Sequence, residues 1–304
     1  MFGSKFVRLV AASAFFLALS GLARAAAPLV LMTDFGVKDG AVSEVKGVAY
    51  GVSPALLISD LTHEIPAGDI WEGAYRLYQV APYWPKGTVF VGVVDPGVGT
   101  SRLSIAVKTK AEHYYVLPDN GLVTLIAEVE GVDEVRTIDE TVNRLKGSEK
   151  SNTFHGRDVF GYTGARLAAG VIGWEQVGPV LATEKLILIP HQKARRDGDA
   201  LVGTIPALDV QYGNVWSDIP EALLTEMNVK PGDRLTVEIF HGGKQVDKVA
   251  APFARTFGDV QKGQPLVYIN SLLNVSVALN LGDYAKAHHI ASGGDWSIRI
   301  HRVY

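Results

Sequence analysis

One segment of the sequence, VVDPGVGTSR, combines residue types that can do chemistry at close spacing. It places the carboxylate of Asp95 at the end of an apolar run, follows it with a Pro-Gly-Val-Gly turn, and places the guanidinium of Arg102 just beyond. Strand ends that open into glycine-rich turns allow the backbone to approach a ligand closely. The alternative is a tight turn whose Asp side chain only accepts hydrogen bonds from local N–H groups.

A second group of polar side chains surrounds His155 in the segment SNTFHGRD. Arg157 and Asp158 flank this histidine just before a predicted helix, and Asp, His and Arg together can hold or deprotonate a water molecule. The competing hypothesis is a metal site, because metal ions bind carboxylate oxygens and imidazole nitrogens. These groups are present in Asp34, Asp95, Asp158 and His155. These four residues show no HxH, HxxxH or DxD spacing, so water activation is favoured and no metal is expected.

Strand-like and helix-like segments alternate along the first 190 residues. We expect strands at Pro28–Met32, Ala55–Leu61, Thr88–Val94 and His113–Leu117, and helices at Gly40–Tyr50, Trp71–Ala81 and Asp158–Gly170. This alternation predicts an α/β domain, residues 28–190, with a mostly parallel central sheet. Ligands bind at the carboxyl ends of strands in such sheets, so Asp34, Asp95 and the pair Asp119-Asn120 are expected to converge on one cleft.

The pattern changes near residue 190. His191–Gly198 is polar and is expected to be a linker, and a further polar cluster, Asp209 with Tyr212 and Asn214, lies in the second part of the chain. Short apolar runs separated by glycine turns predict a smaller, mainly antiparallel β domain over residues 199–304. These runs are Ala200–Asp209, Arg234–Phe240, Gln245–Ala250, Pro265–Ile269 and Trp296–Ile300.

Composition limits the class of protein. The chain of 304 residues has a formal net charge of −3, which gives no basic field for nucleic acid. It has no cysteine, so neither disulfides nor thiolate chemistry are expected.

The first 25 residues have the architecture of a secretory signal peptide. Lys5 and Arg8 precede the apolar stretch Leu9–Leu22, and Ala23-Arg24-Ala25 supplies a small-x-small cleavage pattern. We expect cleavage after Ala25, a periplasmic or secreted protein, and no stable membrane insertion after cleavage. An uncleaved N-terminal anchor is the alternative.

Six motifs in a fixed order resemble the S-adenosyl-L-methionine (SAM) hydroxide adenosyltransferase family, a relative of the adenosyl fluorinases and chlorinases. The resemblance covers essentially all of the mature chain and implies an N-terminal α/β domain, a smaller C-terminal β domain, and homotrimers with active sites between subunits. The motifs are TDFG (33–36), VVDPGVGTSR (93–102), PDNGL (118–122), SNTFHGRD (151–158), YGNVW (212–216) and ALNLGDYA (278–285).

The resemblance implies hydrolysis of SAM, a substrate rather than a cofactor, to adenosine and L-methionine by attack of water at the ribose C5′. In the hydroxide-transferring branch the water is positioned by an Asp–Arg–His set, which here matches Asp95, Arg102 and His155. The halogenases lack this Asp and His and carry a halide-binding serine just after the His position, where this chain has Gly156. No cofactor is expected.

The same resemblance implies the substrate contacts. Asp34 is expected to accept hydrogen bonds from both ribose hydroxyls, and Asp209 to pair with the methionine ammonium. Asn214 is expected to bond the adenine edge, with Tyr212 and Trp216 as aromatic packing surface. Ser271 is expected to bond the methionine carboxylate. The halogenases follow that serine with an arginine, whereas this chain has Leu272.

Three other functions remain open from the sequence. They are an adenosyl halogenase, which the residues Asp95, His155 and Gly156 disfavour, an exported nucleoside-binding protein without turnover, and a hydrolase of another 5′-substituted adenosine. Within the leading hypothesis, the proton acceptor is either His155 or the Asp95–Arg102 pair.

Overall fold

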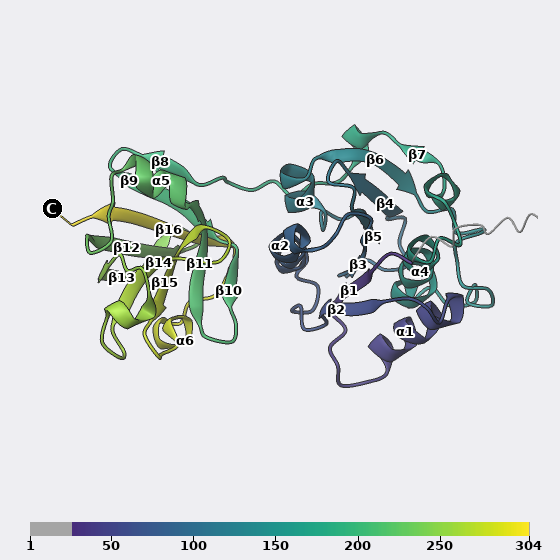
Figure 1. Cartoon of the computed structure of the whole chain (residues 1–304), viewed down its shortest axis with the longest axis horizontal. Helices are drawn as coiled ribbons and strands as arrows, with labels where there is room; N and C mark the ends of the chain where they lie inside the picture. Colours follow the sequence, from purple (N-terminus) through teal and green to yellow (C-terminus); the bar gives the residue numbers. More distant parts are fainter. Residues whose placement is uncertain (1–25, 304) are drawn as a thin grey trace, which may run out of the picture.

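The computed structural model describes residues 26–303, which form two lobes joined by a connecting segment near residue 190 (Figure 1). The predicted signal peptide lies outside the described residues. No helix within residues 26–303 combines the length and the apolar character needed to cross a membrane.

The N-terminal lobe is built on a seven-stranded sheet with the order β2-β1-β3-β5-β4-β6-β7. Strands β2, β1, β3 and β5 pair in parallel, and β4, β6 and β7 extend the sheet in antiparallel fashion. The predicted α/β class with a mostly parallel central sheet is therefore confirmed. The strands are β1 (Leu29–Thr33), β2 (Ile58–Thr62), β3 (Val89–Val93), β4 (Ser104–Thr109), β5 (Tyr114–Pro118), β6 (Val132–Thr137) and β7 (Val180–Leu181).

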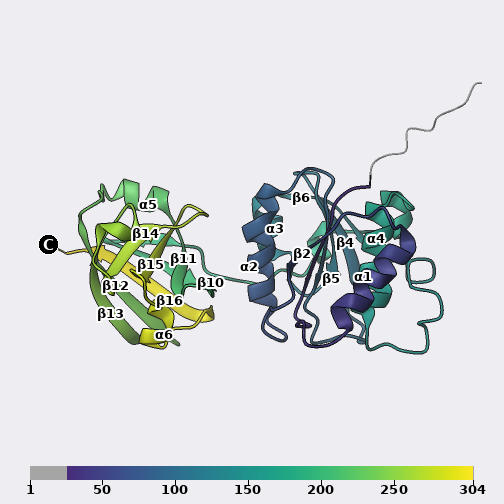
Figure 2. The same cartoon turned by 60° about the horizontal axis from the view of Figure 1, so that its bottom comes forward.

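Helices cover both faces of this sheet (Figure 2). Alternate residues of a strand point to opposite faces, so Leu29 and Leu31 of β1 pack with the α1–α4 side, whereas Val30 and Met32 pack with the α2–α3 side. The predicted helices are present, and a π-helical turn, Gly156–Gly161, starts the last of them. The α-helices are α1 (Ala41–Val52), α2 (Ile70–Val80), α3 (Thr124–Val129) and α4 (Tyr162–Ala168).

The C-terminal lobe contains two antiparallel sheets, as predicted for a β domain. One has the order β13-β12-β16-β9-β8 and the other β10-β11-β15-β14. Two small helices, α5 (Glu221–Glu226) and α6 (Tyr284–His288), complete the lobe. The strands are β8 (Arg195–Asp197), β9 (Ala200–Ile205), β10 (Ala207–Asp209), β11 (Asn214–Pro220), β12 (Arg234–His241), β13 (Lys244–Pro252), β14 (Pro265–Ile269), β15 (Asn274–Leu279) and β16 (Gly293–Arg302).

Two sequence expectations for this lobe need correction. The run Ala200–Asp209 is not one strand, because β9 and β10 belong to different sheets on either side of Pro206, which cannot donate a ladder hydrogen bond. The segment His191–Gly198 is not wholly a linker, because Arg195–Asp197 forms β8 and pairs with β9. Its polar side chains are compatible with a short, exposed edge strand.

Helix α2 provides a contact between the lobes. Tyr75 packs in a small apolar cluster with Ala207 and Trp216, and the guanidinium of Arg76 donates a 2.9 Å hydrogen bond to the carbonyl of Leu208. Glu72, one turn earlier, pairs with Arg76 and holds its side chain. The contact thus joins α2 to β10 and β11.

Candidate functional site

A small cavity of about 60 Å³ lies beyond the carboxyl ends of β1 and β3 in the N-terminal lobe. Three of the predicted polar residues, Asp34, Asp95 and His155, line it together. Arg102 joins this group through its ion pair with Asp95. The rest of the wall comes from Phe35, Val93, Val98, Thr153, Phe154, Gly156 and Phe160.

The turn after β3 forms an ion pair inside a glycine-rich loop. Arg102 donates to Oδ1 of Asp95, whose side chain is 7% exposed, and the Gly97 N–H donates to the same oxygen at 3.1 Å. A Cβ at Gly97 would lie 2.6 Å from Nη2 of Arg102, so only glycine lets the guanidinium lie across the turn. Asp95 therefore both accepts a local N–H bond and pairs with the half-buried charge of Arg102.

The same loop packs against the segment that carries His155. Gly99 has φ +78°, and a Cβ there would lie 2.8 Å from the carbonyl oxygen of Asn152, so glycine is required twice over. Within residues 26–303, no group hydrogen-bonds to the buried Nε2 of His155. Since buried polar atoms normally have a partner, this nitrogen can bind a water molecule in the cavity.

Asp34 approaches the cavity from the end of β1. Its Oδ2 accepts a 2.8 Å hydrogen bond from the Gly68 N–H, and its own N–H donates to the carbonyl of Val93 at the end of β3. The two neighbouring parallel strands thus hold this carboxylate beside Asp95. This is the arrangement that strand-end reasoning predicts.

Asp158, by contrast, has a structural role. It is fully buried and accepts two hydrogen bonds from Arg157, at 2.7 and 3.1 Å, while Arg157 also donates to Glu44 of α1 at 2.5 Å. Hydrogen bonds to both carboxylates raise the pKa of the Arg157 guanidinium. This network fixes the π-helical turn next to His155 and occupies Asp158, which does not line the cavity.

Asp119 and Asn120 were expected to lie in the same cleft, but neither residue lines the small cavity. Oδ1 of Asp119 accepts the Ile187 N–H at 2.9 Å, and Nδ2 of Asn120 donates to the carbonyl of Val94 at 2.8 Å. Burial raises the pKa of the Asp119 carboxyl. Both residues lie at the carboxyl end of a strand, as predicted. Their side chains, however, form hydrogen bonds that connect loops to the sheet.

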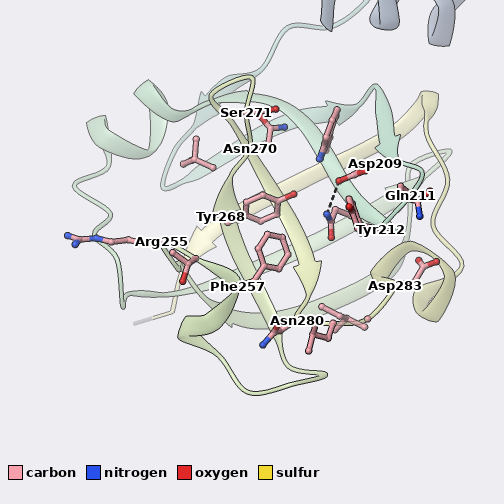
Figure 3. Close-up of a pocket in the computed structure, with 17 residues that line it drawn as sticks. Asp209, Gln211, Tyr212, Arg255, Phe257, Tyr268, Asn270, Ser271, Asn280 and Asp283 are labelled. Atoms are coloured by element: carbon pink, nitrogen blue, oxygen red, sulfur yellow. Dashed lines mark hydrogen bonds between the residues drawn. The ribbon is translucent and has the colours of Figure 1, made fainter. Parts of the chain in front are cut away.

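The C-terminal lobe contains a larger cavity of about 810 Å³ (Figure 3). Its volume is in the range of ligand-binding pockets. All five substrate-binding residues predicted for this lobe line it, namely Asp209, Tyr212, Asn214, Trp216 and Ser271.

A tight turn between β10 and β11 carries the polar wall of this cavity. Nδ2 of Asn214 donates to Oδ2 of Asp209 at 3.0 Å. The dashed line at Asp209 in Figure 3 marks this hydrogen bond. Gly213 in this turn has φ +67°, and the Asp283 side chain occupies the place where a Cβ would lie. Tyr212 beside it is 66% exposed, which leaves its ring free for contact with a ligand.

Sequence reasoning missed two aromatic residues of this cavity. The rings of Phe257 and Tyr268 lie 5.0 Å apart in its wall (Figure 3). Burial raises the pKa of Tyr268, and the charge of Asp209 acts in the same direction, so its hydroxyl stays neutral. Tyr268 could have been suspected from its place in a predicted strand, but Phe257 begins a short 3-10 helix, Phe257–Asp259, that no sequence motif marks.

Leu272 faces away from the ligand cavity. Its side chain packs against the cluster of Tyr75, Ala207 and Trp216 between the lobes, while the preceding Ser271 is exposed at the cavity. An apolar residue at position 272 therefore stabilises the lobe contact. The resemblance places an arginine at position 272 in halogenases. In this chain position 272 supplies no side chain to the wall of the larger cavity.

Within the described part of one chain, the two cavities share no lining residue. Asp34, Asp95 and His155 lie in one, and Asp209, Asn214 and Ser271 lie in the other. The structure thus groups the predicted residues into two sets and does not bring the sets together within a single chain.

Comparisons with known proteins agree on one family. A family model described as the SAM hydroxide adenosyltransferase N-terminal domain matches residues 29–178, and the model of the C-terminal domain matches residues 203–297. A solved structure from Thermotoga maritima, described as an uncharacterized conserved protein, superposes with a TM-score of 0.81 at 34% identity, covering 90% of this chain and all of that one.

Curated relatives extend over nearly the whole chain. Proteins named (R)-S-adenosyl-L-methionine hydrolase from Salinispora tropica and Thermus thermophilus are 35% and 34% identical, covering 86% and 88% of this chain and 93% and 97% of their own. A fluorinase from an Actinoplanes species is 27% identical, covering 87% of this chain and 95% of its own. The chain belongs to the SAM hydroxide adenosyltransferase family.

Proposed function

We propose that this protein hydrolyses SAM to adenosine and L-methionine by attack of a water molecule at the ribose C5′. The observation that carries the proposal is the small cavity of about 60 Å³, which can hold a water molecule. It is lined by Asp95, the ion-pair partner of Arg102, and by His155, whose buried Nε2 has no partner among the described residues. The relatives named hydrolases share more identity with this chain than the fluorinase does, which supports water as the nucleophile.

These residues suit the chemistry of a sulfonium. The C5′–S bond breaks to give a neutral thioether, so the sulfur needs no general acid. The oxygen must instead be held in line with that bond, and alignment of two reactants can contribute about 7–11 kcal/mol. A positioned base adds roughly 10²–10⁴-fold in rate, and His155 or the Asp95–Arg102 pair takes the proton.

The larger cavity would hold the rest of the substrate. Asp209 pairs with the methionine ammonium, and Ser271 bonds the methionine carboxylate. Asn214 bonds the adenine edge. Asp34 of the other cavity accepts hydrogen bonds from the ribose hydroxyls. Tyr212, Trp216 and the newly found Phe257 supply the apolar surface for the base.

We further propose that the protein works as a homotrimer whose active sites form between subunits. The two sets of residues lie in separate cavities of one chain, yet one substrate must touch both sets. A second copy can supply the missing set if its C-terminal lobe faces the N-terminal lobe of its neighbour. A cyclic trimer repeats that head-to-tail contact until it closes.

The test is direct. The mature protein is incubated with SAM, with and without chloride, and nucleosides and amino acids are separated by chromatography. We expect adenosine and methionine in equal amounts in both arms. Formation of 5′-chloro-5′-deoxyadenosine would favour a halogenase, and tight SAM binding without adenosine would favour a nucleoside-binding protein.

We also propose export to the periplasm or the medium, based on the N-terminal sequence. Processed protein should begin at Ala26, which N-terminal sequencing of the extracytoplasmic fraction checks. Recovery of chains that begin at Met1 from that fraction would contradict cleavage.

A further inference from the structure

The lining of the small cavity is partly aromatic. Phe35, Phe154 and Phe160 line it together with Asp34, Asp95 and His155. The cavity of about 60 Å³ has the volume of about two water molecules at about 30 Å³ each, and in the proposed reaction the nucleophile shares this space with the C5′ carbon of the substrate. The position of these rings therefore decides which nucleophiles fit beside Asp95 and His155.

The ring of Phe35 is held firmly in this wall. It meets Phe154 edge-on, with 5.5 Å between ring centroids, and the guanidinium of Arg157 lies 4.9 Å from the centroid of the Phe154 ring. Arg157 is in turn anchored by Asp158 and Glu44. Close packing of this kind keeps a side chain in one rotamer.

Gly156 shows how tightly the Phe35 ring fills its space. A Cβ at position 156 would lie 2.6 Å from Cζ and 3.0 Å from Cε2 of Phe35, which is closer than carbon atoms can pack. The residue after His155 therefore has no side chain because the end of the Phe35 ring already occupies that volume.

We propose that Phe35 limits the nucleophile to the size of a water molecule. The inference rests on the proposed hydrolysis. The ring of Phe35 leaves room for water and excludes larger neutral oxygen nucleophiles, such as alcohols. Loss of Cζ and Cε2 would enlarge the cavity toward Gly156, next to His155, and admit a small alcohol.

The alcohol reaction balances in the same way as hydrolysis. The methanol oxygen bonds to C5′ while the C5′–S bond breaks and leaves its electron pair on sulfur, which releases methionine. The hydroxyl proton passes to the base that serves water. The products are 5′-O-methyladenosine, methionine and one proton.

The experiment compares wild type with Phe35→Leu in buffer that contains SAM and methanol, and measures the ratio of 5′-O-methyladenosine to adenosine by liquid chromatography and mass spectrometry. We expect the ratio to rise by roughly 10–200-fold in the variant, the range in which pockets discriminate one methylene group. Phe35→Met carries the same prediction if the Leu variant fails to fold.

Phe90→Leu is the matched control, because Phe90 lies in the core on the other side of the sheet, where its ring stacks on Tyr115 at 4.9 Å. Its product ratio should equal that of wild type. Equal ratios in wild type and Phe35→Leu would overturn the inference alone. If wild type makes no adenosine, the proposed function falls and this inference falls with it.

Gly156→Ala tests the contact from the opposite side. In wild type the added methyl group collides with Cζ of Phe35, so kcat should fall. In the Phe35→Leu background the colliding atoms are gone, so the same substitution should cost less. An equal loss of kcat in both backgrounds would contradict the proposed contact.

Discussion

At the scale of residues, the proposed chemistry depends on His155, which we assign to the attacking water rather than to the recognition groups of the substrate. Replacing His155 by Ala should lower kcat by about 10²–10⁴-fold, because a side chain that positions or deprotonates the attacking water is lost. KM should change little, since the substrate contacts remain. Steady-state assays of adenosine release measure both constants.

The control for this variant is another histidine-to-alanine change. His241→Ala removes a half-exposed ring in the C-terminal lobe and should leave kcat at the wild-type value. Full activity of His155→Ala would contradict the assigned mechanism.

Residue types, spacing and family motifs predicted some polar members of both cavities, whereas others in the larger cavity, such as Arg255 and Asn270, were not predicted. Asp34, Asp95 and Asp209 lie at strand ends or in turns, where sequence motifs are recognisable. Phe35 and Phe257 could not be predicted, because their roles come from packing between segments distant in sequence. Asp119 shows the converse limit, since a strand-end position does not determine whether a side chain faces a ligand or a loop.

At the scale of elements, a buried ion pair joins β5, α3 and the segment after α2. Nδ1 of His113 lies 2.8 Å from Oε1 of Glu130 and Nε2 lies 3.2 Å from the carbonyl of Trp84, so both ring nitrogens face acceptors. The two side chains are 6% and 8% exposed. An imidazolium that donates from both nitrogens fits this setting.

The pair predicts a stability that depends on pH. Burial alone would lower the pKa of His113, but the bond to Glu130 and its charge raise it above its ordinary 6.5. Burial alone would raise the pKa of Glu130, but His113 and Thr109 hold it below its ordinary 4.5. The stabilisation is therefore complete between pH 4.5 and 6.5. It is lost as pH rises through the raised pKa of His113, or falls through the lowered pKa of Glu130.

His113→Gln should lower the free energy of unfolding by about 3–5 kcal/mol near neutral pH, because Glu130 is left buried without a cation. The difference from wild type should shrink as pH rises above the folded pKa of His113. Thermal unfolding across a pH series measures this. His241→Gln, at an exposed pair with Asp295, is the control, and a His113→Gln deficit that does not vary with pH would contradict the ion pair.

Two central strands with continuous apolar runs could be predicted, whereas several strands interrupted by polar residues could not. Strands β1 and β3 are buried along their whole length and were found from their apolar runs. Strand β11 was missed because Asn214, Ser217 and Asp218 interrupt its hydrophobicity. Antiparallel β6 was missed for a related reason, since three of its six residues are charged and two of these, Asp133 and Glu134, are consecutive.

At the scale of the whole molecule, the split between the two cavities predicts complementation between damaged chains. His155→Ala disables one cavity and Asp209→Ala the other, so each variant alone should be nearly inactive. When the two are unfolded together and refolded as mixed oligomers, random assortment should restore roughly a quarter of wild-type activity, because sites between subunits combine the intact halves. Adenosine release measures the recovery.

The matched control mixes His155→Ala with Asp95→Ala, which damage the same cavity and should not rescue each other. Light scattering should report a trimeric mass for wild type. Failure of the first mixture to regain activity, although mixed oligomers form, would show that each site lies within one chain.

The separation of the two cavities also has a consequence for when the reaction can begin. Under the proposed assembly, a solitary chain is dormant, whatever the concentration of SAM around it. If the proposed export also holds, newly made chains would leave the cell's methyl-donor supply untouched on their way out of the cytoplasm. Onset would follow the local density of delivered chains, so the timing of activity would be set by secretion rather than by a chemical inhibitor.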